Sequence, residues 1–179
     1  MKHTTLMQIA FLVSSESKCI SWNTGCVIEK DGDIISTGCN GTPSGHKNCC
    51  EHAQDMGWTK QKMGIPLREL NEDFRADHSK WSEANEVHAE QNAIMNAAKK
   101  GVSIKGATML CTMSPCPQCA KNIAQSGIRN FIYCHDYDRS NTEWQKLLKD
   151  SGIEIMQISL SKLDKLYFPN IPLRGQLFK

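Results

Sequence analysis

The chain has 179 residues, 40% of them hydrophobic and 22% charged, with a formal net charge of +2 at pH 7. These values are ordinary for one globular domain, so we treat residues 1–179 as a single domain. The small charge, spread over scattered Lys and Arg, argues against a nucleic-acid surface, and no apolar run is long enough for a transmembrane helix. We therefore expect a cytoplasmic protein with no membrane and no stable nucleic-acid partner. Its nine cysteines, an odd number, are expected to be thiols or metal ligands.

The first elements are a helix and a hairpin. Residues 4–16 place apolar side chains on one helical face. Two short alternating runs follow at 26–30 and 33–38, and Asp31-Gly32 between them suits a tight type I′ turn. We predict two antiparallel strands here.

Residues 45–84 lack a clear period, and we expect an irregular insertion there. A long irregular segment in a compact domain requires extra stabilisation. A second zinc ion would provide it, because metal binding adds directly to the free energy of folding. The Cys and His residues within reach exceed the four that such a site requires. From the residues alone, the choice among them stays open.

The second half alternates helices and strands. Helices are predicted at 88–100, ending near Gly101, at 115–126, ending near Gly127, and at 141–152. Strands are predicted at 107–112, 128–134 and 153–158. This alternation indicates an α/β fold, a three-layer α/β/α sandwich around a mixed five-stranded sheet.

Two motifs at predicted helix starts carry the chemistry. Cys116 and Cys119 are three residues apart, so both sulfurs can point the same way, and a helix N-terminus favours the thiolate. His88 would complete three protein ligands, which leaves a fourth zinc position open for water. Glu90 is then free to move protons. This His-x-Glu and Pro-Cys-x-x-Cys pattern is the signature of zinc-dependent base deaminases.

The same residues allow other kinds of site. The Cys116/Cys119 pair alone could be a redox pair or half of a zinc ribbon. His88, Glu90 and the strand directly before the cysteines favour the catalytic site instead. A non-catalytic zinc module would require a fourth ligand and would have no use for a free carboxylate.

The sequence resembles the cytidine and deoxycytidylate deaminase superfamily, most clearly the phage-type deoxycytidylate (dCMP) deaminases. The resemblance runs through LMQIAFLVSSESKC, GCVIEKDGDIISTGCNGTPSG, NEVHAEQNAI, SPCPQCAKNIAQSGI and YCHDYDRS, which cover most of residues 6–140. It implies the cytidine deaminase-like fold and hydrolysis of dCMP to dUMP and ammonia, which supplies dUMP for thymidylate synthesis. It further implies a homohexamer, activation by dCTP with Mg²⁺, inhibition by dTTP and, for a phage protein, the host cytoplasm.

The resemblance also assigns residues. The second, structural zinc would be held by Cys19, Cys49, His78 and Glu86, with Cys50, His46 and His52 as substitutes. Substrate contacts are expected from Asn40, Ala89, Ser114, Tyr137, Ser21 and Asn23, and effector contacts from Lys30, Gly41 and Thr42. Cys39 stands where the family usually has tyrosine, which is a departure near the effector site.

The same scaffold could also act on a nucleoside, on tRNA adenosine or on a single strand. Asn40 and Tyr137 favour a mononucleotide, because the resemblance places them at its sugar and phosphate end. The predicted mechanism uses zinc to activate water at C4 of cytosine, while Glu90 carries protons to N3 and to the leaving amino group.

Overall fold

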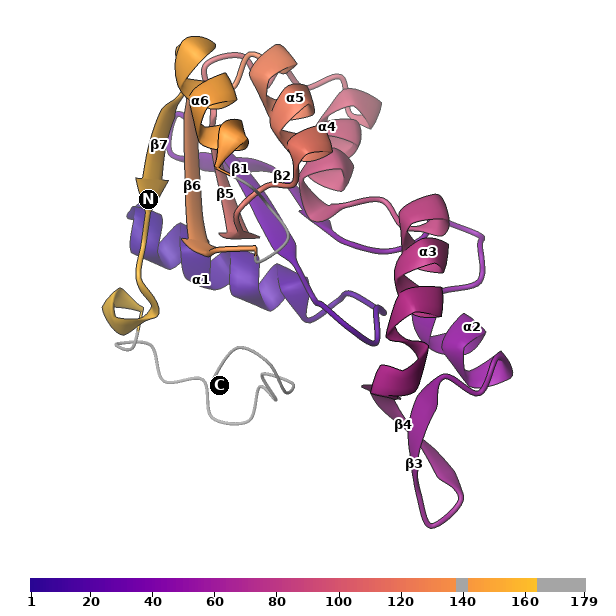
Figure 1. Ribbon diagram of the computed structural model, residues 1–179. Coiled ribbons are helices and arrows are strands. Elements are labelled where there is room, and N and C mark those ends of the chain that lie inside the picture. The colour runs from indigo at the N-terminus through magenta and orange to yellow at the C-terminus, as the bar shows by residue number, and fades with distance from the viewer. Residues whose placement is uncertain (138–141, 164–179) are drawn as a thin grey trace.

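The computed structural model describes residues 1–137 and 142–163, and its centre is a mixed five-stranded sheet. The strand order is β2-β1-β5-β6-β7 (Figure 1). The strands are β1 Gly25–Lys30, β2 Asp33–Cys39, β5 Thr108–Met113, β6 Asn130–His135 and β7 Glu154–Gln157. Strand β1 is antiparallel to both neighbours, whereas β5, β6 and β7 are parallel. The predicted sheet is confirmed.

Helices cover both faces of this sheet. Helix α1 (His3–Ser14) packs on β1 and β5 from one side. Helices α4 (Ala89–Lys99), α5 (Pro117–Gln125) and α6 (Glu143–Asp150) lie on the other side (Figure 1). The three-layer α/β/α sandwich is therefore confirmed, and within the described residues α1 is the α-helix of one outer layer.

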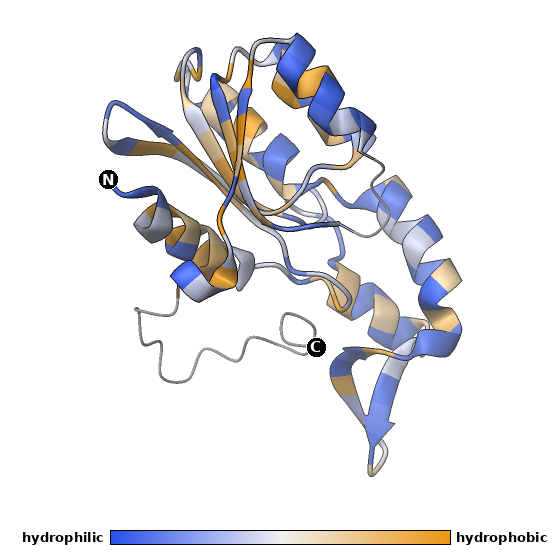
Figure 2. Ribbon diagram, turned by 60° about the vertical axis from the view of Figure 1, so that its left-hand side comes forward, coloured by the Kyte–Doolittle hydropathy of each residue, from blue (hydrophilic) through white to orange (hydrophobic). Residues whose placement is uncertain are grey.

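Strand β5 is the centre of the core, since all six of its residues are buried. Side chains of a strand alternate between its faces. Leu110 accordingly joins the apolar cluster under α1, whereas Met109 and Cys111 join the cluster under α4, α5 and α6. Figure 2 shows the hydrophobic residues concentrated in the sheet and the inner faces of its helices.

The β1–β2 hairpin forms the turn that the sequence predicts. Asp31 and Gly32 both have positive φ, 54° and 94°. A type I′ turn requires positive φ at both central residues, and Asp and Gly tolerate it.

Helix α4 lies unusually close to β2. A Cβ atom added to Gly38 would be 2.4 Å from Ala93 N and 2.5 Å from Ala89 O, so only glycine fits there. Ser36 Oγ donates to Ala93 O (2.7 Å), and the Asn92 side chain donates to Cys39 O (2.8 Å). These contacts fix the start of α4 relative to the end of β2.

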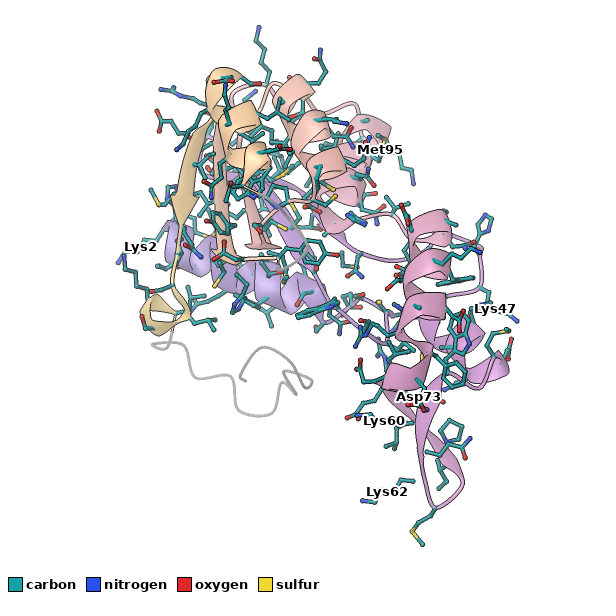
Figure 3. The ribbon with its side chains drawn as sticks, in the orientation of Figure 1. Lys2, Lys47, Lys60, Lys62, Asp73 and Met95 are labelled. Carbon is teal, nitrogen blue, oxygen red and sulfur yellow. The ribbon has the colours of Figure 1, made fainter. Side chains whose placement is uncertain are left out.

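The expectation of an irregular insertion at 45–84 is wrong in one respect, because the segment contains regular elements. They are α2 Cys49–Asp55, β3 Thr59–Lys62, β4 Ile65–Leu70, the 3-10 helix Glu72–Phe74 and α3 Arg75–Asn85. They extend away from the sheet (Figure 1) and enclose a small apolar cluster of their own. Polar side chains such as Lys60, Lys62 and Asp73 project from them (Figure 3). Strand β3 (TKQK) is polar and β4 (IPLREL) does not alternate, and both are largely exposed, so neither gives a strand pattern in the sequence.

No helix in residues 1–137 and 142–163 is long and apolar enough to cross a membrane.

Candidate metal centres and substrate cavity

A cavity of about 700 Å³ opens at the edge where β5 and β6 end. Met113 and His135, the last residues of these parallel strands, are register partners, so the loops after both strands meet at this edge. Strand β1 begins and β2 ends at the same edge, since Gly25 pairs with Cys39. Open α/β sheets commonly bind ligands at this position.

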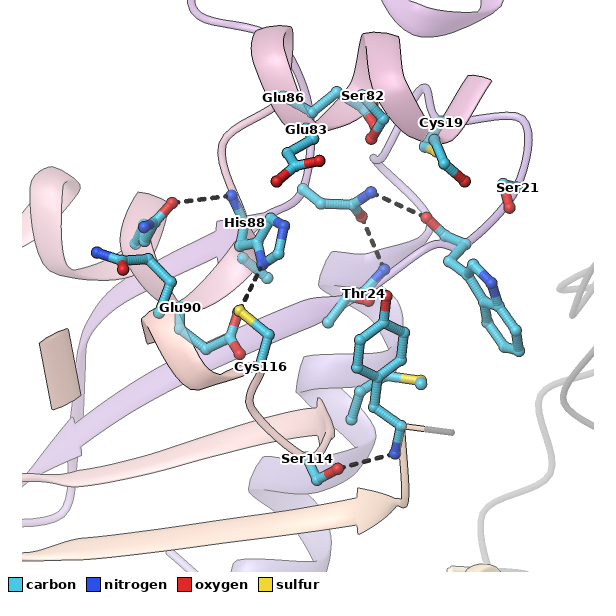
Figure 4. Close-up of a pocket in the computed structure, with 18 of the residues that line it drawn as sticks. Cys19, Ser21, Thr24, Ser82, Glu83, Glu86, His88, Glu90, Ser114 and Cys116 are labelled. Atoms are coloured by element: carbon cyan, nitrogen blue, oxygen red, sulfur yellow. Dashed lines mark hydrogen bonds between the residues drawn. The ribbon is translucent and has the colours of Figure 1, made fainter. Parts of the chain in front are cut away.

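The helix starts of α4 and α5 bring three metal-ligating side chains together. His88 precedes α4, and Cys116 precedes α5 and accepts a hydrogen bond from Cys119 N (3.4 Å). His88 Nδ1 lies 3.5 Å from Cys116 Sγ (Figure 4) and 3.4 Å from Cys119 Sγ. The three residues thus meet as the sequence predicts.

These separations suit a tetrahedral zinc ion. With ordinary Zn–N and Zn–S bonds, tetrahedral ligand atoms lie about 3.6 Å apart for N and S and about 3.8 Å apart for two sulfurs. All three donor atoms lie within 4.8 Å of one another. The donor set therefore fits a metal with three protein ligands and one open position.

In the group of His88, Cys116 and Cys119, Cys116 is the thiol that most readily carries the negative charge. Its hydrogen bond with Cys119 lowers the pKa of the Cys116 thiol to about 4, and the hydrogen bond with Cys116 raises the pKa of His88 to about 9. Glu90, on the first turn of α4, is 4% exposed, and this burial raises the pKa of its carboxyl. A buried carboxyl beside a metal site is suited to holding and releasing a proton.

A second group of four buried side chains, Cys19, Cys49, His78 and Glu86, adjoins the same cavity, which three of them line. Cys49 Sγ is 3.2 Å from His78 Nε2 and 3.9 Å from Cys19 Sγ, and Cys19 Sγ is 3.7 Å from His78 Nε2. One donor atom from each of these residues and from Glu86 falls within 4.8 Å of the others. These distances again match the edges of a zinc tetrahedron.

The buried carboxylate of Glu86 supports a cation at this second group. Its Oε2 accepts a hydrogen bond from Ser82 Oγ (2.5 Å), whereas the buried Oε1 has no hydrogen-bond partner. Leaving a buried carboxylate oxygen unpaired is costly, so an ion here would satisfy it. The substitutes Cys50, His46 and His52 lie outside the group.

Most of the expected substrate residues line the cavity: Ser21, Asn40, Ala89, Ser114 and Tyr137. The Asn40 amide also organises the loop before β1, since it accepts from Thr24 N (2.8 Å) and donates to Trp22 O (2.9 Å). Tyr137 is placed by its backbone N–H, which donates to Ser114 Oγ (2.8 Å).

The remaining expected residues do not line the cavity. Asn23 is not a lining residue, and its side-chain oxygen is buried without a hydrogen-bond partner. Gly41 pairs with Val87 through two backbone hydrogen bonds, next to His88. Lys30 lies at the opposite end of the hairpin, opposite Asp33, so the structure does not bring it together with Gly41 and Thr42.

Sequence reasoning missed several residues that line the cavity, including Trp22, Thr24, Arg75 and Lys121. Arg75 begins α3, inside the segment expected to be irregular. Neither a motif nor a periodic pattern marks it. Only the fold of the insertion brings it to the cavity.

Comparisons with known proteins agree with this geometry. Residues 1–135 match the family model described as the cytidine and deoxycytidylate deaminase zinc-binding region. Deoxycytidylate deaminase of Enterobacteria phage T4 is 47% identical over 96% of this chain and 97% of its own length. The phage T2 enzyme is also 47% identical, over 88% of this chain and 93% of its own length.

A solved structure shows the same architecture. The dCMP deaminase of cyanophage S-TIM5, in complex with dCMP and dUMP, superposes with a TM-score of 0.65 at 33% identity. The match covers 88% of this chain and 99% of that one. With two helix starts converging on one imidazole and two thiols beside a buried glutamate, the chain belongs to the zinc-binding cytidine and deoxycytidylate deaminase family.

Proposed function

We propose that the chain catalyses hydrolysis of dCMP to dUMP and ammonia. The observation that carries this proposal is the three-ligand group of His88, Cys116 and Cys119 beside the buried Glu90, at one side of a cavity of about 700 Å³. The names of the phage relatives and the dCMP and dUMP bound to the cyanophage enzyme support the choice of substrate.

In the proposed reaction, three residues bind the metal ion and Glu90 transfers the protons. A zinc ion bound by His88, Cys116 and Cys119 would supply the Lewis acid that activates water. Glu90 accepts a proton from the attacking water and delivers it to N3 of cytosine. It then transfers the second water proton to the departing amino group, so that water and dCMP become ammonia and dUMP.

Backbone and amide groups orient the nucleotide. Ala89 is the first residue of α4, so its N–H has no partner within the helix and can bind the base edge. The carbonyl of Ser114 is proposed as the second contact to the base, and Asn40 as a contact to the sugar. Asn40 retains one amide hydrogen and one lone pair beyond its bonds to Thr24 and Trp22.

The group formed by Cys19, Cys49, His78 and Glu86 is proposed to hold a structural zinc ion. It ties the loop before β1 to α2 and α3, whose own apolar cluster is small. Binding of a metal there adds directly to the folding free energy of the insertion.

Regulation, assembly and location are proposed from the family likeness. We infer a homohexamer in the host cytoplasm, activated by dCTP with Mg²⁺ and inhibited by dTTP, that supplies dUMP for thymidylate synthesis. Gly41 and Thr42 are the proposed effector contacts. Lys30, at the far end of the hairpin, would require a separate contact.

The first test measures loss of cytosine absorbance with dCMP, deoxycytidine and a cytosine-containing single strand in parallel. We expect turnover of dCMP, and a fall of at least about 10³-fold in kcat for Glu90→Gln, because the proton carrier is lost. Zinc content should persist in Glu90→Gln and fall in Cys116→Ala. Turnover of the strand alone, or full activity of Glu90→Gln, contradicts the proposal.

A further inference from the structure

We propose that the segment Glu86-Val87-His88 couples the two ligand groups, so that a metal ion in the second ligand group positions His88 and raises the metal affinity of the catalytic group. The catalytic group is His88, Cys116 and Cys119, and the second ligand group is Cys19, Cys49, His78 and Glu86. This inference rests on the proposed function, since it concerns how the proposed catalytic site is formed. It makes Val87 and its partner Gly41 positioning residues.

A single residue separates the two groups along the chain. Glu86, the last residue of the second ligand group, is the C-cap of α3, and His88 is the N-cap of α4. The next nearest member, His78, precedes His88 by ten residues (88 − 78). Residues 86–88 are therefore the shortest covalent path between the groups.

The backbone of this segment directs both side chains to the same side. Glu86 has φ −99° and ψ 136°, and His88 has φ −71° and ψ 158°, which are extended values. In an extended chain, residues i and i+2 project from the same face, about 6.6 Å apart. Glu86 and His88 accordingly both line the cavity (Figure 4). A change in the backbone at Glu86 thus reaches His88 through one residue.

Val87, between them, is paired with Gly41. The two residues form an isolated antiparallel bridge, in which Val87 N donates to Gly41 O (2.8 Å) and Gly41 N donates to Val87 O (3.1 Å). Gly41 follows β2, whose end is joined to α4 by the hydrogen bond from the Asn92 side chain to Cys39 O (2.8 Å). The bridge therefore aligns residues 86–88 with the end of the sheet.

The bridge alone is too small to order this segment. Two backbone hydrogen bonds contribute a net free energy similar to the conformational entropy that is lost when two or three residues are fixed. A second constraint is required, and a bound Glu86 carboxylate supplies it. This carboxylate accepts a hydrogen bond from Ser82 Oγ (2.5 Å), but its buried Oε1 has no partner, so a cation would hold it more firmly.

The direction of His88 depends on the residues before it. Its carbonyl accepts a hydrogen bond from Asn92 N (2.9 Å), which joins its C-terminal side to α4. Cys116 and Cys119 belong to another helix start, that of α5, so they do not fix the His88 backbone. When Glu86 and Val87 are ordered, His88 has less freedom to lose as the catalytic group binds its own metal ion, which raises the affinity.

The simpler alternative is that the second ligand group stabilises the insertion and has no effect on the catalytic group. The two groups would then bind metal independently, and their binding free energies would add. Coupling makes the free energies non-additive, and each group then raises the metal affinity of the other by the same factor. Zinc affinities therefore distinguish the two cases.

The test uses four proteins: the parent, Cys49→Ala, Cys116→Ala and the double variant. Each protein is freed of metal and titrated with zinc against a competing chelator, and zinc per chain is measured. Cys49→Ala reports the catalytic group, Cys116→Ala reports the second ligand group, and the double variant corrects for other binding. The coupling factor is the product of the two association constants of the parent, divided by the product of the two single-group constants.

We expect a coupling factor of roughly 5- to 150-fold, the usual range for two linked sites. The same four measurements are then repeated with Val87→Gly and Val87→Ala. Val87→Gly should lower the factor by about 2- to 5-fold, because glycine returns backbone freedom to the segment. Val87→Ala, the matched control, should keep the parent factor. Both variants retain every ligand and both backbone hydrogen bonds of the bridge, and a loss of stability alone changes the melting temperature but not the factor.

Three outcomes overturn the inference. A coupling factor near 1 makes the groups independent, and an equal factor in Val87→Gly and Val87→Ala moves the coupling to another route. A parent protein that binds one zinc ion per chain removes the second ligand group. The proposed function fails separately, since a parent with the coupling factor but without turnover of dCMP would refute deamination and leave the coupling in place.

Discussion

At the scale of single residues, His135 is a half-buried imidazole whose Nε2 lacks a hydrogen-bond partner. It ends β6, contacts Phe11 edge to face at 5.9 Å between ring centroids, and its Nε2 is buried without a partner. Burial lowers the pKa of His135, and the nearby Asp136 offsets this in part. The folded protein thus favours the neutral ring.

This predicts a pH dependence of stability. A histidine with a lowered folded-state pKa binds its proton more readily when unfolded, so it opposes folding as pH falls below its unfolded pKa of about 6.5. We expect the melting temperature of the parent protein to fall more between pH 7.5 and pH 5.5 than that of His135→Phe. Calorimetry at both pH values measures the difference. A larger fall in His135→Phe would show that protonation of His135 does not destabilise the fold.

The proposed catalytic and metal-binding residues could be predicted because they form two short motifs whose residue types and spacing are typical of a zinc site. Cys116, Cys119, His88 and Glu90 lie at helix starts, where local sequence alone fixes the side-chain direction. Arg75 could not be predicted, because it reaches Ser21 only after the chain between them has folded. The side-chain role of Asn40 in holding the loop at Trp22 and Thr24 was missed for the same reason.

At the scale of elements, the close packing of α4 on β2 positions the catalytic helix. Gly38 is the point of contact, where an added Cβ would overlap the backbone of α4. We expect Gly38→Ala to destabilise the protein by about 1–3 kcal/mol and to reduce kcat, since α4 carries Glu90. Thermal melting and turnover measure both effects.

Gly41→Ala serves as the control for stability. Gly41 follows the same strand, but an added Cβ there meets nothing within 4 Å. We expect the melting temperature of Gly41→Ala to stay within about 2 °C of the parent value, as is typical of surface substitutions. Equal destabilisation by both variants would contradict the role of Gly38.

The proposed structural zinc predicts that the fold of the insertion depends on the four residues of the second ligand group. We expect Cys49→Ala to lower the zinc content from about two ions to about one per chain, and to weaken amide protection in α2 and α3 while β5 and β6 stay protected. Hydrogen exchange measured by mass spectrometry separates these regions. Cys50→Ala is the matched control, because Cys50 is adjacent but outside the group. A loss of zinc in Cys50→Ala alone would contradict the assignment.

The insertion also marks the limit of sequence reasoning about elements. The family resemblance predicts the ligands at the insertion, but hydrophobic periodicity in the sequence does not predict its helices and hairpin. Strand β3 is the polar run TKQK, and α3 buries only His78. Elements of this kind are stabilised by tertiary contacts, and by a metal when bound, more than by amphipathic faces.

At the scale of the whole molecule, the sandwich follows from strong local signals. Strand β5 is buried throughout and leads into Cys116, while the hairpin turn at Asp31-Gly32 fixes the antiparallel edge. Because β5 and β6 are parallel, the residues after them meet at one edge, which places Ser114 beside Tyr137. The expected helix at 141–152 begins at Glu143, and residue 141 lies outside the described residues.

The positions of the two ligand groups along the chain have a consequence for protein synthesis. Cys19, Cys49, His78 and Glu86 all precede His88, whereas the other group is completed only by Cys119. A ribosome therefore releases the last ligand of the insertion 33 residues (119 − 86) before the last ligand of the catalytic group. A metal ion present during translation therefore meets the complete second ligand group first, while β5, the centre of the sheet, is still unsynthesised or inside the ribosome.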